Sequence, residues 1–390
     1  PLQVTIPDED RVWARQALAG SSQWVAVQAG ASDVMKAWRP HLFGVSLAQL
    51  SQQWHGGLAF IGSSEEEGTI AEVMRVYREA GGRNPVKNLA GRTTLSQLAA
   101  LLAECRILLT NDTGPMHIGV AAGTSVIDLS VGHVDYQETG PYGRGHWVIQ
   151  PELDCAPCGF EQVCAHHACK DRISPDLVAN LLLHVLRDRP SPSQVSGARL
   201  YMSDVDEDGL GTFRLKVGAE SSVIAWYAGF WRRYWYETHT GICSKLPAPD
   251  GPPPDARQAR ESMQRLIVLL ETACRRADDI ARLAGQGPSN LSQVTRLQRE
   301  QGVEKERLHL VGINSSATAP VTAAFLRQLQ SDNVKGLDRL ARHHAGAYRT
   351  YLSRVLDIER RLFGVHANDV CLTPDPGSNI RQVGPAQRVA

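Results

Sequence analysis

Apolar residues in the first half of the chain gather in short runs that alternate with amphipathic segments. Strands are predicted where four short apolar runs occur, at residues 24–28, 58–61, 107–110 and 125–129. Helical spacing of apolar positions marks the segments between and beyond these runs, at residues 41–54, 66–80, 95–103 and 114–122. This alternation predicts an α/β fold, with a parallel sheet covered by helices on both faces. Ligands of such sheets bind at the carboxyl ends of the strands.

The pattern changes after about residue 190, where a Pro- and Ser-rich linker begins. Residues 199–217 alternate as a hairpin does, with an acidic turn at 206–209, and residues 222–240 are rich in aromatic side chains. Asp255 then starts a long amphipathic helix, whose apolar positions are Met263, Leu266, Ile267, Leu270, Ala273, Ala277 and Ile280. Further helices are predicted at residues 289–308, 319–331 and 334–362.

These patterns divide the chain into five segments. A linker and helix take up residues 1–20, and an α/β domain takes up residues 21–190. A hairpin and an aromatic linker follow at 191–250, a helical extension at 251–364, and a disordered tail at 365–390. The first residue is Pro1 rather than Met, so we expect the chain to be a piece of a longer protein.

Composition narrows the classes of function. The 390 residues include 41 basic and 41 acidic side chains, so no basic surface for nucleic acid is expected. No run approaches the roughly 20 apolar residues that span a bilayer, and no signal peptide is visible. We therefore expect a cytoplasmic protein.

One strand-to-helix junction has the pattern of a phosphate-binding turn. The apolar run at 107–110 leads into Asn111, Asp112, Thr113 and Gly114, and Pro115 suits the first position of a helix. Free amides and the positive dipole at such a helix start favour a pyrophosphate, and Gly114 lets the backbone approach it closely. The alternative is an ordinary helix cap made by Asp112 or Thr113. The residues alone do not separate these two interpretations.

Six segments together resemble glycosyltransferase family nine, the ADP-heptose:lipopolysaccharide heptosyltransferases. Asp112 to His117 followed by a helix of small residues is similar to the signature of this family. The other similar segments, in family order, are 28–32 with Lys36, Trp38 and Pro40, then 62–65, 91–95, 139–143 and 155–158. Arg39 is inserted relative to the family pattern between Trp38 and Pro40. The resemblance covers roughly residues 1–190.

The resemblance implies a Rossmann-like fold for residues 21–190, the C-terminal, donor-binding domain of a GT-B enzyme. The donor would be a nucleoside-diphosphate sugar, ADP-heptose in this family. Lys36 would stabilise the leaving diphosphate, and Glu65 or its neighbour Glu66 would accept hydrogen bonds from the ribose. Thr93 would lie beside the base. The remaining residues implied to bind the donor are Ala31, Ser32, Asp112, Thr113, Gly114, Pro115 and His117.

Most of these residues also have simpler interpretations. Lys36 alone would be a solvated surface lysine, Glu65 an acid at a helix start, and His117 a packed core histidine. Thr93 and its neighbour Thr94 also fit a plain helix cap.

The resemblance also implies an inverting transfer to a lipopolysaccharide-type or surface-glycan acceptor, without a metal or other required cofactor. Such an enzyme would work at the cytoplasmic face of the inner membrane, with peripheral membrane contact. The catalytic base of the family lies in its N-terminal domain, and no segment of this chain matches that domain. The alternative is an inactive nucleotide-sugar-binding module whose helical tail binds a partner protein.

Four cysteines lie close together at Cys155, Cys158, Cys164 and Cys169. Four thiolates in so short a segment could enclose a structural zinc ion. Plain thiols and disulfides are the alternatives, and a cytosolic protein favours the first over the second.

Two further patterns have a simple and a specific interpretation. Residues 204–209 match the start of a calcium-binding EF-hand loop, but Leu215 occupies the position of the final acidic ligand, so an acidic hairpin turn is favoured. Residues 226–236 are aromatic and basic. They suit a core seam better than a surface that docks on a membrane.

Overall fold

The computed structural model describes residues 2–158, 164–330 and 336–364, and the chain divides into two compact units at 219/220. Each unit has its own hydrophobic core. The predicted disordered tail at 365–390 lies outside the described residues.

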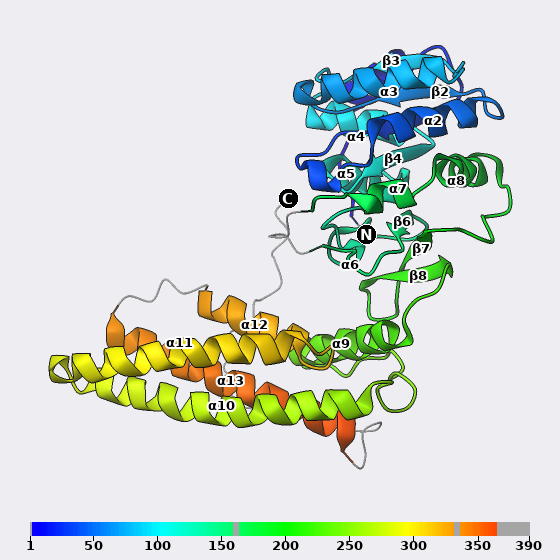
Figure 1. The fold of residues 1–390 in the computed structure, drawn as a ribbon. Helices are drawn as coiled ribbons and strands as arrows, with labels where there is room; N and C mark the ends of the chain where they lie inside the picture. The colour runs from blue at the N-terminus through cyan, green and yellow to red at the C-terminus, as the bar shows by residue number, and fades with distance from the viewer. Residues whose placement is uncertain (1, 159–163, 331–335, 365–390) are drawn as a thin grey trace. The chain divides into compact units, whose positions relative to one another are not determined.

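The first unit is built on one sheet with the strand order β3-β2-β1-β4-β5-β6-β7-β8 (Figure 1). The strands from β3 to β6 are parallel, and their order is that of a dinucleotide-binding Rossmann sheet. The bounds are β1 Trp24–Gln28, β2 Gly57–Phe60, β3 Val86–Asn88, β4 Ile107–Asn111, β5 Ser125–Leu129 and β6 Trp147–Pro151. The predicted parallel α/β sheet is confirmed.

Helices cover both faces of this sheet because the buried strands carry apolar side chains on both sides. Val25 and Val27 of β1 face one core, which α2 (Pro40–Ser51), α3 (Glu67–Glu79) and α8 (Pro175–Arg187) complete. Ala26 faces the other core. The helices of that second core are α1 (Asp8–Ala17), α4 (Leu95–Glu104) and α5 (Gly114–Ala121).

The hairpin expected at 199–217 forms, but it belongs to the sheet rather than to a linker. Strand β7 (Ala198–Val205) pairs antiparallel with β6, and β8 (Gly211–Val217) pairs with β7. The contact between Phe213 and Tyr136 of the short helix α6 (Tyr136–Thr139) anchors the hairpin, with ring centroids 5.0 Å apart. The first unit therefore extends to residue 219, because strand pairing joins the hairpin to the α/β domain.

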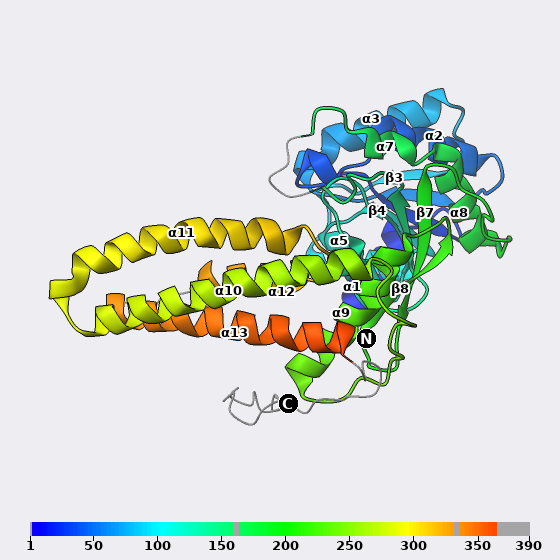
Figure 2. The same cartoon turned by 60° about the horizontal axis from the view of Figure 1, so that its bottom comes forward.

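The second unit consists of helices in its described part. Three long helices, α10 (Ala256–Gly285), α11 (Leu291–Ile313) and α13 (Leu337–Phe363), run side by side in both views (Figures 1 and 2). The shorter α12 (Ala319–Gln330) packs on α13. The apolar positions predicted for the long helix, from Met263 to Ile280, are buried except for the half-buried Ile267. Asp255 precedes that helix but makes no side-chain cap, because its carboxylate accepts a hydrogen bond from Tyr227.

Residues 222–240, expected in an aromatic linker, instead form the helix α9 (Ser222–Thr240). Tyr227, Phe230, Trp231 and Tyr234 are buried in the core of the helical unit. The aromatic side chains are therefore buried, as the interpretation of a core seam expects. The segment that carries them is a helix and not a linker. Among the described residues, no helix is long and apolar enough to cross a membrane.

Candidate nucleotide-sugar site

The candidate site lies where the strand order of the sheet reverses. Strands β1 and β4 are neighbours in the sheet but are separated in the chain by β2 and β3. The carboxyl ends of the strands at such a reversal are the usual ligand site of sheets of this kind. The loop after β1 carries Ala31, Ser32 and Lys36, and the turn after β4 carries Asp112 and Thr113. The fold thus brings the loop after β1 and the turn after β4, both predicted to bind the donor, to the same edge of the sheet.

Asn111, the last residue of β4, holds the first loop in place. Its fully buried carboxamide nitrogen donates to the carbonyls of Ala29 and Gly30, both at 3.0 Å. Its carbonyl oxygen accepts from the backbone N–H of Trp38 at 2.9 Å. One side chain therefore satisfies backbone groups at both ends of the loop that carries Lys36. Buried amide pairs of this kind are costly to leave unmade.

Thr113 does not cap the helix that follows it. As the residue before α5 it makes no side-chain cap hydrogen bond, and its hydroxyl instead donates to Oε1 of Gln28 at 3.1 Å. The carboxyl of Asp112 accepts from the hydroxyl of Thr139. Neither side chain makes a cap hydrogen bond to α5, so the interpretation as an ordinary helix cap is not supported. The start of α5 is left without a side-chain cap.

The start of α5 is open above Gly114. A Cβ added at this glycine would meet no atom within 4 Å, so the protein itself does not require glycine here. Pro115 has no N–H, and the N–H of Met116 already donates to the carbonyl of Thr113 at 3.0 Å. The first helical residue, Gly114, therefore presents an amide without an intrahelical partner, together with the positive end of the helix dipole. Both favour an anion.

Asp112 links the two loops electrostatically. Burial raises the pKa of its carboxyl above the ordinary value, and the hydrogen bond from Thr139 and the nearby His117 and Lys36 act in the opposite direction. Asp112 is only 7% exposed, whereas His117 lies at the surface, so the interpretation of His117 as a packed core histidine is not supported. Lys36 is half-buried in the short turn Val34–Lys36, which also argues against a solvated surface lysine.

The acid that faces the first loop is Glu66 rather than Glu65. Oε1 of Glu66 accepts from Nε2 of Gln28 at 2.9 Å, and its Oε2 accepts from the N–H of Ser63 at 2.7 Å. A Cβ added at Gly30 would lie 1.8 Å from the Glu66 carboxylate, so this glycine gives the carboxylate its space. Glu65 is exposed. The structure thus favours Glu66 as the residue of this pair at the site.

Gln28 connects three elements at the end of β1. Its amide donates to Glu66, and its Oε1 accepts from the hydroxyls of Thr113 and Thr110, the latter at 3.2 Å. The sequence analysis did not assign a role to this residue. The sequence nevertheless hinted at a role for Gln28, because a polar side chain at the end of a buried apolar strand requires a hydrogen-bond partner.

A short helix near the end of the family resemblance, α7 (Ala168–Arg172), clamps the loop that carries Lys36. The buried Lys170 donates from Nζ to the carbonyl of Val34 at 2.5 Å, and its own carbonyl accepts from Nε1 of Trp38 at 2.8 Å. Arg39, inserted relative to the family pattern, forms two hydrogen bonds to Asp171, at 2.5 and 2.8 Å. This ion pair is partly exposed, so its contribution to stability is small, and the clamp rests mainly on Lys170 and Trp38.

The remaining residues predicted to bind the donor are exposed or half-buried. Ser32 is exposed and Ala31 half-buried. Thr94 caps α4, accepting from the N–H of Gln97 at 3.2 Å, so the cap interpretation holds for Thr94 and not for the half-buried Thr93.

The four clustered cysteines carry free thiols, as the plain-thiol interpretation expects and the disulfide interpretation does not. Within the described part of the chain, no group of three or more His, Cys, Asp or Glu side chains is arranged to hold a metal ion. The structural zinc ion at Cys155, Cys158, Cys164 and Cys169 stays an untested prediction.

The acidic segment 204–209 forms the hairpin turn that the sequence favoured over a calcium loop. Asp204 pairs with Arg214 at 2.8 Å and with Arg144 at 2.6 Å. Arg214 also pairs with Asp206 at 2.5 Å. Arginine side chains therefore form ion pairs with the carboxylates of Asp204 and Asp206, which a calcium ion would need as ligands.

Comparison with known proteins supports the segment-by-segment resemblance. The family model of glycosyltransferase family 9 (heptosyltransferase) matches residues 3–168. Lipooligosaccharide heptosyltransferase 2 of Campylobacter jejuni is 26% identical over 156 residues, which cover 39% of this chain and 47% of that protein. Lipooligosaccharide heptosyltransferase 2 of Haemophilus influenzae is 34% identical over 154 residues, or 39% of this chain and 43% of that protein. The chain thus spans less than half the length of these relatives.

Solved structures of heptosyltransferases align with part of the chain. ADP-heptose lps heptosyltransferase II of E. coli aligns with 20% identity and a TM-score of 0.38, over 48% of this chain and 54% of that one. The E. coli heptosyltransferase WaaC with ADP aligns with 18% identity and a TM-score of 0.29, over 34% and 39%. The similarity to this family rests on the sequence match. Residues 3–168 of this chain are thus similar to glycosyltransferase family 9 (heptosyltransferase).

Proposed function

We propose that the first unit binds a nucleoside-diphosphate sugar and that the protein transfers the sugar to a lipopolysaccharide-type or surface-glycan acceptor. The observation that carries this proposal is the uncapped start of α5, which lies beside Asp112 with Lys36 and His117 close by. The names of the relatives support heptose as the sugar, and the structure of WaaC with ADP supports ADP as the nucleotide.

The diphosphate of the donor is assigned to the α5 start. As the bond to the sugar breaks, negative charge builds up on the departing diphosphate. The amide of Gly114 and the dipole of α5 would stabilise that charge, and the ammonium of Lys36 would add to them. His117, exposed at the same edge, can add a hydrogen-bond donor.

Glu66 is assigned to the ribose of the donor. Gln28 and Ser63 each donate to one carboxylate oxygen and so hold the group in one orientation. A carboxylate oxygen has more than one lone pair, so Glu66 can still accept from the two hydroxyls of a ribose.

The transfer itself is proposed to invert the anomeric carbon, in a single in-line attack by an acceptor hydroxyl. The positive groups at the α5 start take the role that a divalent cation has in other transferases, so no metal is required. The acceptor is proposed to be a glycolipid at the cytoplasmic face of the inner membrane. The base that deprotonates the acceptor is not assigned to any residue described above.

Calorimetry with ADP tests the proposal on the chain as it exists. We expect saturable one-to-one binding, unchanged within twofold when EDTA replaces Mg²⁺. The variant Gly114→Val should fold normally, because the space above Gly114 is empty. Its isopropyl group would occupy the space proposed for the diphosphate, so it should weaken ADP binding by about tenfold or more. Lys36→Met should have a similar effect.

The matched control is Lys216→Met, which removes an exposed lysine on β8 at the other end of the sheet from β3. Its ADP affinity should equal that of the unaltered protein. The proposal is rejected if folded protein binds neither ADP nor an ADP-sugar. It is also rejected if all three variants have the same affinity.

A further inference from the structure

One face of α9 carries a ladder of aromatic rings in the second unit. Trp226, Phe230 and Tyr234 are spaced by one helical turn each. The rings of Trp226 and Phe230 are stacked with centroids 5.8 Å apart, and those of Phe230 and Tyr234 are stacked at 6.1 Å. Phe230 and Tyr234 are buried, while Trp226 is half-buried at the outer end of the ladder. The ladder forms a flat apolar wall.

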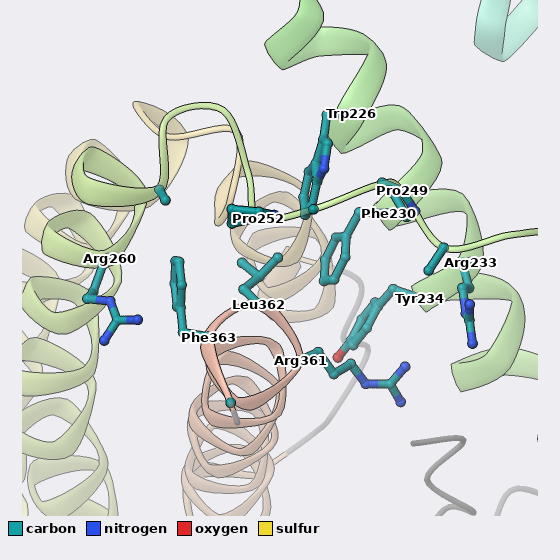
Figure 3. Close-up of a pocket in the computed structure, with 14 residues that line it drawn as sticks. Trp226, Phe230, Arg233, Tyr234, Pro249, Pro252, Arg260, Arg361, Leu362 and Phe363 are labelled. Carbon is teal, nitrogen blue, oxygen red and sulfur yellow. The ribbon is translucent and has the colours of Figure 1, made fainter. Parts of the chain in front are cut away.

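A cavity of about 460 Å³ lies against this wall (Figure 3). The loop with Pro249 and Pro252 closes one side, and the end of α13 with Leu362 and Phe363 lies opposite the ladder. The volume is within the range of about 300–1,000 Å³ that is usual for sites of small organic ligands. The cavity is lined by residues of the second unit alone.

The charged side chains that line the cavity are all arginines: Arg233, Arg260 and Arg361. Beneath them, the buried carboxylate of Glu237 accepts from Arg361 at 2.7 Å and from Arg233 at 3.0 Å. Burial acts to raise the pKa of Glu237, yet hydrogen bonds from Arg361, the Ser244 backbone and Arg233 hold it below the ordinary value. Glu237 is thus an ionised structural partner for two of the three cations.

Arg260 is the cation that this structural network does not use. It is exposed, and its guanidinium lies over the ring of Phe363, 4.6 Å from the centroid. Among the described residues it has no carboxylate partner. Stacking on Phe363 holds the guanidinium at the cavity while its N–H groups remain free to donate.

We propose that this cavity binds an aromatic acid: a flat ring system with a carboxylate, phosphate or sulfonate bonded directly to the ring. The ring would stack against the ladder of Trp226, Phe230 and Tyr234. The anionic group would accept hydrogen bonds from Arg260. The site lies outside the residues that match the family 9 model and does not rest on the function proposed for the first unit.

Two fluorescent probes of matched shape test the proposal on the full chain. Anilinonaphthalene sulfonate has both a ring system and an anionic group, whereas phenylnaphthylamine has the same rings without the charge. We expect the sulfonate to bind saturably at one site per chain and about tenfold more tightly than the neutral probe, as a charged hydrogen bond provides. ADP should not displace it, which separates this site from the nucleotide site of the first unit.

Two variants and a control locate the probe. Arg260→Met should weaken sulfonate binding by about tenfold and leave the neutral probe unchanged. Trp226→Leu should weaken both probes by several fold, because both lose ring stacking. The control is Arg257→Met, because Arg257 is fully solvated one turn earlier on α10 and pairs with Glu261 outside the cavity. It should change neither affinity.

The proposal is overturned if the sulfonate fails to saturate, if ADP displaces it, or if the neutral probe binds equally well. It is also overturned if Arg260→Met and Arg257→Met have the same effect. Circular dichroism and the melting temperature of each variant show that it is folded, so loss of binding is not confused with loss of structure.

Discussion

The side-chain amide of Gln28 donates to Oε1 of Glu66 across 2.9 Å, joining the end of β1 to the turn after β2. The same side chain accepts from Thr113 at 3.1 Å. Gln28 is 2% exposed, so these bonds form in a largely dry environment. Gln28 therefore sets the positions of two side chains proposed to contact the donor, while it is itself buried.

Replacing Gln28 tests this positioning role. Gln28→Met keeps the size of the side chain and removes its hydrogen bonds, so Glu66 and Thr113 each lose a partner. We expect a loss of about 1–3 kcal/mol in stability and a clear loss of ADP affinity. Denaturant unfolding and calorimetry measure the two effects. Gln52→Met, at an exposed site at the end of α2, should change neither. Normal ADP affinity in Gln28→Met would contradict the role.

The two neighbouring acids give a second test. Glu66→Gln should weaken ADP binding because a carboxamide accepts ribose hydroxyls less well than a carboxylate does. The exposed Glu65→Gln is the matched control and should bind ADP normally. With 2′-deoxy-ADP, which lacks one of the hydroxyls, the difference between the two variants should shrink. If Glu65→Gln has the larger effect, the assignment of Glu66 is wrong.

The clamp on the Lys36 loop gives a third test. Lys170→Met removes the bond from Nζ to the carbonyl of Val34 and leaves the surrounding packing similar. The loop should then hold Lys36 less firmly, and ADP should bind several-fold more weakly. Adenosine, which has no diphosphate, should bind as before. Calorimetry with both ligands separates this result from general misfolding, which would weaken both.

The buried Asp128 predicts a dependence of stability on pH. Its carboxyl oxygens have no hydrogen-bond partner within the described structure, and burial, reinforced by Asp112, raises its pKa well above the ordinary value. The folded state therefore keeps a proton that the unfolded state releases above about pH 4. Stability should fall as the pH rises from the unfolded pKa towards the folded one, by up to about 1.4 kcal/mol per pH unit.

Asp128→Asn removes this titration while it keeps the shape of the side chain. Its melting temperature should exceed that of the unaltered protein by a margin that increases as the pH rises above about 4, the ordinary pKa of an aspartate. A margin that stays constant with pH would show that Asp128 does not carry the buried proton.

Strands β1, β2, β4 and β5 and the turn at Asp112 to Gly114 could be predicted from the sequence, because local periodicity and helix-start chemistry determine them. The sequence did not predict β3 and β6. The choice between a helix cap and an anion site could not be predicted, because a threonine suits both. What separates them is the bond from Thr113 to Gln28, 85 residues away in the chain. The choice between Glu65 and Glu66 likewise depends on which acid meets Gly30 across the sheet.

The second unit was harder to predict for a similar reason. The one-turn spacing of Trp226, Phe230 and Tyr234 was a helical signal, but the aromatic content of the segment obscured it. The hairpin was predicted correctly as a local element. The hairpin joins the sheet through pairing between β6 and β7. The alternation of apolar and polar residues along a strand does not specify which distant strand it pairs with.

A crystal structure of the chain with bound ADP tests the central claim most directly. We predict that the diphosphate lies at the start of α5, with a phosphate oxygen accepting from the N–H of Gly114 and another near Nζ of Lys36. Glu66 should contact the ribose. ADP bound elsewhere on the molecule, with the start of α5 still open, would contradict the account.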